Sequence, residues 1–295
     1  MIKPQIAQKD VTLHILKTFG IHMSKKLGQN FLVDPGIVSG IVDAARLQAG
    51  DQVLEIGPGI GTLTQGLAES GAQVTAVELD RRLIEVLAKT LEGYQNVRVI
   101  HGDILKLDIS REIAAERYSV VANLPYYITT PIIMRLLEER LPINVLVTMV
   151  QKEVADRMVA VPGGKDYGAL SVAVQYYTEP EIMFAVPPKS FIPAPAVESA
   201  VIRCTVRRQP PVQVNEKLFF RVVKGAFSQR RKTLANALKT TGVDRETLST
   251  VLEQAGIDGQ RRGEQLSLAE FAAIANVWPG ASKKPSLETN NKDRS

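Results

Sequence analysis

The sequence predicts an α/β protein in which an open, mostly parallel sheet is followed by a smaller all-helical domain. From residue 52 to about 150, short apolar runs alternate with amphipathic stretches, as in parallel strands joined by crossover helices. A Pro-Pro pair at 210–211 then interrupts the chain, and only helical patterns follow. The length of 295 residues suits about two domains. We therefore expect a first domain over residues 1–208, a helical domain over 209–280 and a disordered polar tail over 281–295.

The first domain is expected to contain a helix followed by seven strands. Asp34 and Pro35 are typical of an N-cap and a first helical position, and apolar residues follow at helical spacing. The last two strands have no long helix between them, so we expect them to pair antiparallel at the sheet edge. The predicted strands span residues 53–56, 74–77, 97–100, 120–122, 145–150, 170–177 and 199–206.

Three helices are predicted in the second domain. Gly256 is placed to end the second of them, and Ser267 with Glu270 forms a capping box at the start of the third. The predicted helices span residues 216–240, 244–255 and 267–276.

Composition argues against several classes of protein. Hydrophobic residues make up 45% of the chain, which is enough for a packed core. No apolar run approaches the roughly 18 residues of a membrane-spanning helix, and the first ten residues lack the apolar core of a secretory signal. A single cysteine, Cys204, and three histidines argue against disulfides and a His/Cys metal site. We expect a monomeric, cytoplasmic protein that binds neither a membrane nor a metal.

Positive charge is concentrated late in the chain. The net charge is +5, yet residues 203–262 alone hold 13 Lys or Arg against 5 Asp or Glu. This asymmetry favours a polyanionic partner, although a basic domain can also serve solubility alone.

A glycine-rich turn follows the first predicted strand. Gly57, Gly59 and Gly61 lack Cβ atoms, so a ligand can lie against the backbone at the carboxyl edge of the sheet. Glu78 ends the next strand, 21 residues after Gly57, where a carboxylate can accept both hydroxyls of a ribose. The pattern favours a nucleoside ligand; the alternative is a glycine turn with a solvated Glu.

Two details argue against NAD as that ligand. The third glycine comes one position earlier than in the dinucleotide fingerprint. Asp103, after the third strand, could accept a hydrogen bond from the amino group of an adenine, or it could simply cap a helix.

The fourth strand ends in Asn-Leu-Pro-Tyr at 123–126, which suits methylation of an exocyclic aromatic amine. If the Asn123 side-chain oxygen and the Leu124 carbonyl accept the two N–H bonds, the lone pair of a poor nucleophile can be held out of the ring plane. Pro125 rigidifies the turn, and Tyr126 offers a face for a flipped base. The alternative is a tight turn in which Tyr126 fills the core.

Four segments together give the chain a recognisable resemblance. They are Lys-Leu-Gly-Gln-Asn-Phe-Leu at 26–32, Glu-Ile-Gly-Pro-Gly-Ile-Gly at 55–61, Asn-Leu-Pro-Tyr at 123–126 and Phe-Ile-Pro-Ala-Pro-Ala-Val-Glu-Ser at 191–199. The chain resembles the ribosomal RNA adenine dimethyltransferases over nearly all of its expected ordered length. It is more similar to their KsgA/RsmA branch than to the Erm resistance methylases.

The resemblance implies a class I, Rossmann-like fold that uses S-adenosylmethionine. Asn30 and Leu32 would flank the methionine end of the cofactor, Glu78 would hold its ribose and Asp103 its adenine. The cofactor-binding residues so implied are Asn30, Leu32, Gly57, Gly59, Glu78, Asp103 and Asn123.

The resemblance also implies the catalytic residues Asn123, Leu124, Tyr126 and Phe191. Phe191 would stack on the target base opposite Tyr126; a core aromatic is the alternative. The implied substrate is two adjacent adenosines in the 3′-terminal hairpin loop of 16S rRNA, within the immature small ribosomal subunit.

A basic stripe on the predicted helix over 216–240 is the expected RNA surface. Its proposed RNA contacts are Arg221, Lys224, Arg231 and Lys232, with a solvated helix face as the alternative. Three other functions remain open: an assembly factor with secondary methylation, an Erm-type 23S rRNA methylase and an NAD-dependent oxidoreductase.

Overall fold

The computed structural model describes residues 4–22 and 28–281, in two compact units. The first contains Met1–Ala160 and Leu170–Pro210, and the second contains Val161–Ala169 and Pro211–Ser295. The division at 210 lies two residues beyond the expected boundary. Residues 161–169, which we expected in the first domain, belong to the second unit. The expected disordered tail, apart from residue 281, lies outside the described residues.

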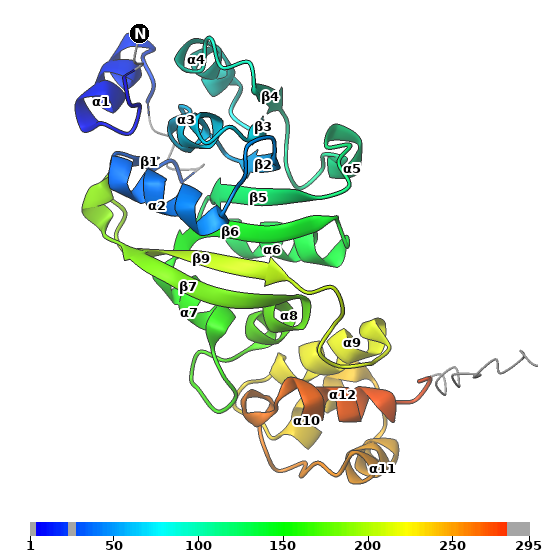
Figure 1. The fold of residues 1–295 in the computed structure, drawn as a ribbon. Helices are drawn as coiled ribbons and strands as arrows, with labels where there is room; N and C mark the ends of the chain where they lie inside the picture. The colour runs from blue at the N-terminus through cyan, green and yellow to red at the C-terminus, as the bar shows by residue number, and fades with distance from the viewer. Residues whose placement is uncertain (1–3, 23–27, 282–295) are drawn as a thin grey trace, which may run out of the picture. The chain divides into compact units, whose positions relative to one another are not determined.

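The first unit is built on a seven-stranded sheet of order β4-β3-β2-β5-β6-β9-β7 (Figure 1). β4, β3, β2, β5 and β6 run parallel, and β9 pairs antiparallel with both β6 and β7. A short antiparallel pair, β1 with β8, lies apart from it. The strands are β1 (Phe31–Leu32), β2 (Gln52–Ile56), β3 (Gln73–Glu78), β4 (Val97–His101), β5 (Tyr118–Asn123), β6 (Ile143–Gln151), β7 (Thr178–Val186), β8 (Phe191–Ile192) and β9 (Ser199–Val206).

Helices cover both faces of this sheet, with α2 and α3 in front of it and α6, α7 and α8 behind it in Figure 1. Apolar side chains of α2 and α3 form one core cluster with the central strands. The helices are α1 (Lys9–Thr18), α2 (Pro35–Ala45), α3 (Thr62–Glu69), α4 (Arg81–Thr90), α5 (Ile109–Glu112), α6 (Thr129–Glu138), α7 (Lys152–Val159) and α8 (Ala169–Tyr177). No helix among the described residues is long and apolar enough to span a bilayer.

The predicted start of α2 is confirmed. The Asp34 side chain accepts hydrogen bonds from the backbone N–H groups of Gly36 (3.1 Å) and Ile37 (3.4 Å), and Pro35 occupies the first helical position. The cap satisfies donors that a helix leaves free at its first turn.

The strand prediction for residues 170–177 is wrong, because these residues form α8. Nearly every side chain of α8 is buried, so the segment has no polar face to reveal a helical period. Its valines and tyrosines then favoured a strand. The antiparallel edge exists, but β7 forms it with β9.

The second unit is helical, but the predicted single helix over 216–240 is also wrong. α9 (Glu216–Phe227) is followed by a turn, by α10 (Leu234–Leu238) and by the one-turn helix η3 (Lys239–Thr241). Residues 228–233 between α9 and α10 are all polar, so a continuous helix there would bury nothing. The separate axis of α10 buries Leu234 and Leu238 completely.

α11 (Arg245–Ala255) and α12 (Leu268–Asn276) complete the second unit, with the short helix η4 (Gly263–Gln265) between them. Gly256 ends α11 with a left-handed conformation, and the capping box of Ser267 and Glu270 is present; both were predicted. The ring of Phe227 contacts those of Tyr167 and Phe271 at centroid distances of 6.0 and 5.8 Å. Tyr167 thus ties the segment 161–169 to this helical core.

Candidate active site

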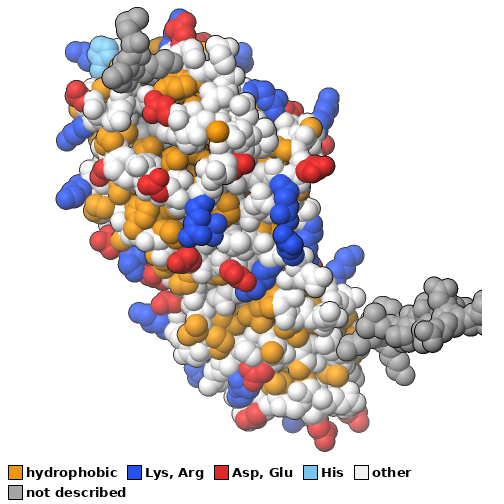
Figure 2. Space-filling view, viewed as in Figure 1, with side chains coloured by type: hydrophobic (Ala, Val, Ile, Leu, Met, Phe, Trp, Pro, Cys, Tyr) orange, Lys and Arg blue, Asp and Glu red, His pale blue; other side chains and the backbone are white. Residues whose placement is uncertain are grey.

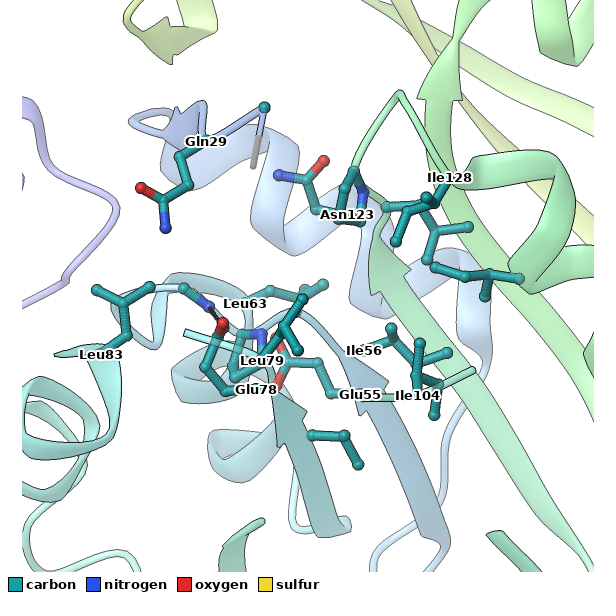
Figure 3. A pocket seen from close by; sticks show the side chains of 18 of the residues that line it. Gln29, Glu55, Ile56, Leu63, Glu78, Leu79, Leu83, Ile104, Asn123 and Ile128 are labelled. Carbon is teal, nitrogen blue, oxygen red and sulfur yellow. Dashed lines mark hydrogen bonds between the residues drawn. The ribbon is translucent and has the colours of Figure 1, made fainter. Parts of the chain in front are cut away.

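A cavity of about 1040 Å³, including its open mouth, lies at the carboxyl ends of β2, β3 and β5 (Figure 3). In open α/β sheets this edge is where ligands bind, because loops from parallel strands meet there. The cavity brings together all but one of the residues that the sequence assigned to cofactor binding and catalysis. Those that line it are Asn30, Leu32, Gly57, Gly59, Glu78, Asp103, Asn123, Leu124 and Tyr126.

The glycine-rich turn forms one wall of the cavity. Gly57, Gly59 and Gly61 all have left-handed backbones, with φ of 70°, 63° and 92°. A Cβ on Gly59 would lie 3.4 Å from the ring of Phe31, and one on Gly57 would lie 4.0 Å from the Asn123 carbonyl oxygen. The turn therefore needs glycine, and it brings the backbone close to the catalytic segment.

Glu78 is buried at the cavity wall, with 6% of its surface exposed. Its two carboxylate oxygens accept hydrogen bonds from the N–H groups of Gly59 (3.1 Å) and Asp80 (2.7 Å). Burial raises the pKa of Glu78, and these backbone donors counteract part of the increase. The glycine turn thereby fixes the orientation of the carboxylate that is expected to hold a ribose.

Asp103 has a structural role as well as a place in the cavity. Its Oδ1 accepts a hydrogen bond from the Leu105 N–H at 2.9 Å, so it caps the turn after β4. The cap fixes the side chain beside the cavity, and the two interpretations of Asp103 are compatible.

β5 ends at Asn123, and the chain then turns sharply. The Leu124 N–H donates to the Met149 carbonyl (3.1 Å), while the Pro125 carbonyl accepts from the Thr129 hydroxyl (3.0 Å). The Asn123 side chain points into the cavity (Figure 3). Within the described part of the chain, no residue hydrogen-bonds its carboxamide. Its acceptor is therefore available to a ligand.

The two aromatic residues expected to hold the target base lie in different surroundings. Tyr126 lines the cavity, and its hydroxyl is hydrogen-bonded to the Ser199 hydroxyl. Phe191 is only 3% exposed, packs in the core cluster and pairs with Leu32 across β1 and β8. It does not line the cavity, so its position is that of the core aromatic that we held as the alternative.

Sequence analysis did not single out several residues of the cavity, and three of them bear on its chemistry. Tyr127 is 51% exposed at the cavity. Gln29 donates a hydrogen bond of 2.9 Å to Asp80. Glu55 is 1% exposed, and burial together with the nearby charge of Glu78 raises its pKa to about 8. A carboxylate inside an apolar strand was the available signal for Glu55, and a second tyrosine after Tyr126 was the signal for Tyr127.

The residues expected to bind RNA are all exposed in the second unit, but they do not share one helix. Arg221 and Lys224 lie on α9, whereas Arg231 and Lys232 lie in the turn after it. Arg221 also donates to the Thr241 carbonyl at 2.5 Å, so it has a structural role. Over residues 4–22 and 28–281, no group of three or more His, Cys, Asp or Glu side chains could hold a metal ion.

Comparison with known proteins places this geometry in a family. The profile described as "Ribosomal RNA adenine dimethylase" matches residues 21–278. "Ribosomal RNA small subunit methyltransferase A" of Geobacillus thermodenitrificans is 52% identical over 282 residues, covering 92% of this chain and 96% of the relative. The protein of the same name from Alkaliphilus oremlandii is 50% identical over 279 residues, covering 92% and 97%.

Two solved structures are also similar. A dimethyladenosine transferase from Plasmodium falciparum has a TM-score of 0.71 and 28% identity, covering 83% of this chain and 95% of its own. The 23S rRNA methyltransferase ErmE has a TM-score of 0.64 and 27% identity, covering 84% and 99%.

The sheet order, the glycine turn and the polar edge of the cavity define a class I, S-adenosylmethionine-dependent methyltransferase. Within that class, the match over residues 21–278 and the 50% identical relatives identify the branch. The chain belongs to the ribosomal RNA adenine dimethylase family. The resemblance seen in the sequence is confirmed.

Proposed function

We propose that this protein transfers methyl groups to the N6 atoms of two adjacent adenosines in the 3′-terminal hairpin loop of 16S rRNA, within the immature small subunit. The observation that carries the proposal is the Asn123 carboxamide, which points into a cavity walled by the glycine turn and Glu78. The relatives named for small-subunit methylation are at least 50% identical, against 27% for ErmE. This difference favours 16S over 23S rRNA.

The residues of the cavity fit S-adenosylmethionine. The glycine turn leaves space that a Cβ would fill, and Glu78 presents a carboxylate already oriented by two backbone donors. Asn30 and Leu32 would hold the methionine end, and Asp103 would accept from the adenine amino group. When bound, this cofactor supplies an electrophilic methyl group on a positively charged sulfur.

Asn123 and Leu124 would orient the target amine. Their oxygens can accept both N–H bonds of an adenine amino group, and Pro125 offers no N–H to compete. The hydrogen bond from the Leu124 N–H to Met149 helps to fix the turn from which these oxygens project. Such alignment can lower the barrier by several kcal/mol, on the order of 7–11 at the well-oriented limit.

Tyr126 would stack on the flipped adenine, a contact worth about 1–3 kcal/mol per base. Its hydroxyl is held by the hydrogen bond to Ser199 on β9, which restrains the ring. Tyr127, half exposed at the cavity, is the second aromatic residue that we assign to the base. The stacking role of Phe191 stays a prediction: its ring is buried, and its cross-strand partner Leu32 lines the cavity.

The second unit would contribute phosphate contacts through Arg221, Lys224, Arg231 and Lys232, all of them exposed. A loop adenine suits the site, because extruding a base costs least where it is unpaired. Such a substrate also implies a cytoplasmic protein.

Mass spectrometry of rRNA is the direct test. Small subunits from cells that lack this methylation should gain two adjacent dimethyladenosines in 16S rRNA when treated with the protein and S-adenosylmethionine. The Asn123→Ala variant should bind the cofactor within a few-fold of wild type but methylate at least 100-fold more slowly. Methylation of 23S rRNA instead would make the Erm-type alternative correct.

A further inference from the structure

A second cavity in the first unit lies at the opposite end of the sheet from the candidate active site. It is formed where α2 ends, where β5 and β6 begin and where β9 ends. The four arginines that line it are Arg46, Arg117, Arg203 and Arg208. The space-filling view shows Lys and Arg side chains gathered at the level of β5, β6 and β9 (Figure 2).

Few carboxylates lie near these guanidinium groups to balance their charge. Asp51 is the one carboxylate of the lining, and it accepts a hydrogen bond from the Gln48 N–H at 2.8 Å. No salt bridge joins any of the four arginines to a carboxylate in the described part of the chain. Like charges brought together in this way favour a bound anion.

Several other arginines of the same unit are paired with carboxylates. Arg82 with Asp80 (2.6 Å), Arg98 with Glu112 (3.1 Å) and Arg135 with Glu139 (2.6 Å) form salt bridges. Such pairs neutralise a guanidinium locally, and among the described residues the four cavity arginines have no such pair.

Arg203 is the most enclosed of the four. Its Nε donates to the Ala44 carbonyl (3.0 Å) and its Nη1 to the Thr205 hydroxyl (2.6 Å), so the planar group is held in place. Burial and the charge of Arg46 lower its pKa, while exposed Glu181 on the neighbouring strand acts in the opposite direction. A fixed, partly buried guanidinium beside another cation is suited to a phosphate oxygen.

Arg46 adds a backbone argument. It ends α2 in the left-handed conformation, with φ of 54°, where glycine is the usual residue. An arginine here accepts a less favourable backbone and places its side chain at the cavity.

We propose that this arginine cavity binds phosphate groups of the RNA backbone and so forms a second contact with the substrate, separate from the pocket that receives the adenine. Arginine forks match phosphate oxygens, and RNA supplies many phosphates at once. β5 joins the two sites: Ser119 lines the arginine cavity and Asn123 the active site, about 13 Å apart at ~3.3 Å per residue. One extended RNA can reach both. The inference rests on the proposed function.

The test compares RNA binding by Arg117→Gln/Arg208→Gln with wild type, because both side chains are exposed and need not support the fold. Lys9→Gln/Lys17→Gln, on α1, removes the same charge elsewhere and is the matched control. Arg46→Gly is a second variant that removes a cation while relaxing the backbone. The probe is the unmethylated small subunit, bound between about 50 and 200 mM KCl, where phosphate contacts change affinity steeply. Thermal unfolding is measured in parallel.

We expect the cavity variants to bind roughly tenfold more weakly, with a salt slope smaller by about 0.7–0.9 for each phosphate that they no longer neutralise. Their affinity for S-adenosylmethionine should match wild type; the thermal stability of Arg117→Gln/Arg208→Gln should also match it, and that of Arg46→Gly should be at least as high. Binding and slope equal to those of the α1 control would overturn the inference and leave the proposed function intact. Stabilisation by inorganic phosphate that the variants lack, with unchanged RNA binding, would also overturn it and indicate a free-anion site. Failure of wild type to methylate the small subunit would refute the proposed function and the inference together.

Discussion

At the scale of single residues, the site depends on protein groups that hold side chains in place before any ligand arrives. Glu78 is oriented by two N–H donors, Asp103 by one and Tyr126 by a serine hydroxyl. Each of these side chains was identifiable by its place after a strand, because the carboxyl ends of parallel strands meet at one edge. Phe191 was not, because the pairing of β1 with β8 decides whether that ring faces core or cavity.

We predict that Glu78→Gln weakens binding of S-adenosylmethionine about 10- to 100-fold. The amide has one acceptor oxygen where the carboxylate has two, so one ribose hydroxyl would lose its hydrogen bond to a charged oxygen, which is worth about 1.5–3 kcal/mol. Calorimetry measures the cofactor affinity and filter binding measures RNA affinity, which should not change. Glu85→Gln, an exposed residue of α4, is the control. Equal losses of both affinities would contradict the assignment.

Glu55 should make the stability of the protein fall with rising pH. The unfolded residue titrates near 4.5 and the folded one at about 8, so between these values the folded state holds a proton that the unfolded state has released. Deprotonation then favours unfolding, by up to about 2–3 kcal/mol between pH 5 and pH 7.

Glu55→Gln removes this titration and should flatten the profile. Urea unfolding at pH 5, 6 and 7 measures the free energy of unfolding for both proteins. Parallel profiles would mean that Glu55 is charged in the folded protein.

At the scale of elements, helix caps and the alternation of apolar strands with amphipathic helices predicted the structure well. Segments without a polar face did not. The start of α2, the end of α11 and the start of α12 were predicted because their caps are local hydrogen bonds encoded by adjacent residues. α8 was mistaken for a strand because burial on all sides removes the polar face. β7 was not predicted, because its start, Thr178-Glu-Pro-Glu, carries charges and a proline that a strand tolerates only at a sheet edge.

Asp34→Ala should lower the free energy of unfolding of the first unit by about 1–2 kcal/mol. Asp34 caps α2 and also accepts a hydrogen bond from the Ser190 hydroxyl (3.0 Å), which links two segments far apart in sequence. Asp108→Ala removes a cap from the single turn of α5, which is a shorter helix, and should cost less. Urea denaturation measures the free energy of unfolding of both variants. A larger loss of that free energy for Asp108→Ala than for Asp34→Ala would contradict the prediction.

At the scale of the whole molecule, positive charge is divided between the two units. The basic stretch over residues 203–262 spans the expected domain boundary at 208. Arg203, Arg207 and Arg208 precede the division at 210 and belong to the first unit. Two of them line the arginine cavity, whereas Arg207 pairs with Glu179 at 2.7 Å. Sequence position alone could not separate a paired arginine from an unpaired one.

The turn between α9 and α10 provides the clearest test of the second unit as an RNA-binding surface. Arg231 and Lys232 are exposed, and no hydrogen bond or salt bridge of the described residues involves their side chains, so truncation should not disturb the fold. The Arg231→Ala/Lys232→Ala variant should bind the unmethylated small subunit roughly tenfold more weakly, with a salt slope smaller by about 0.7–0.9 per phosphate left without its cation. Arg221 is less suitable, because its bond to Thr241 couples binding to stability. Filter binding over a salt series, with Lys9→Ala/Lys17→Ala as control, measures both quantities. An unchanged slope would mean that this turn is only solvated, and the RNA contacts of the protein would then lie elsewhere in the chain.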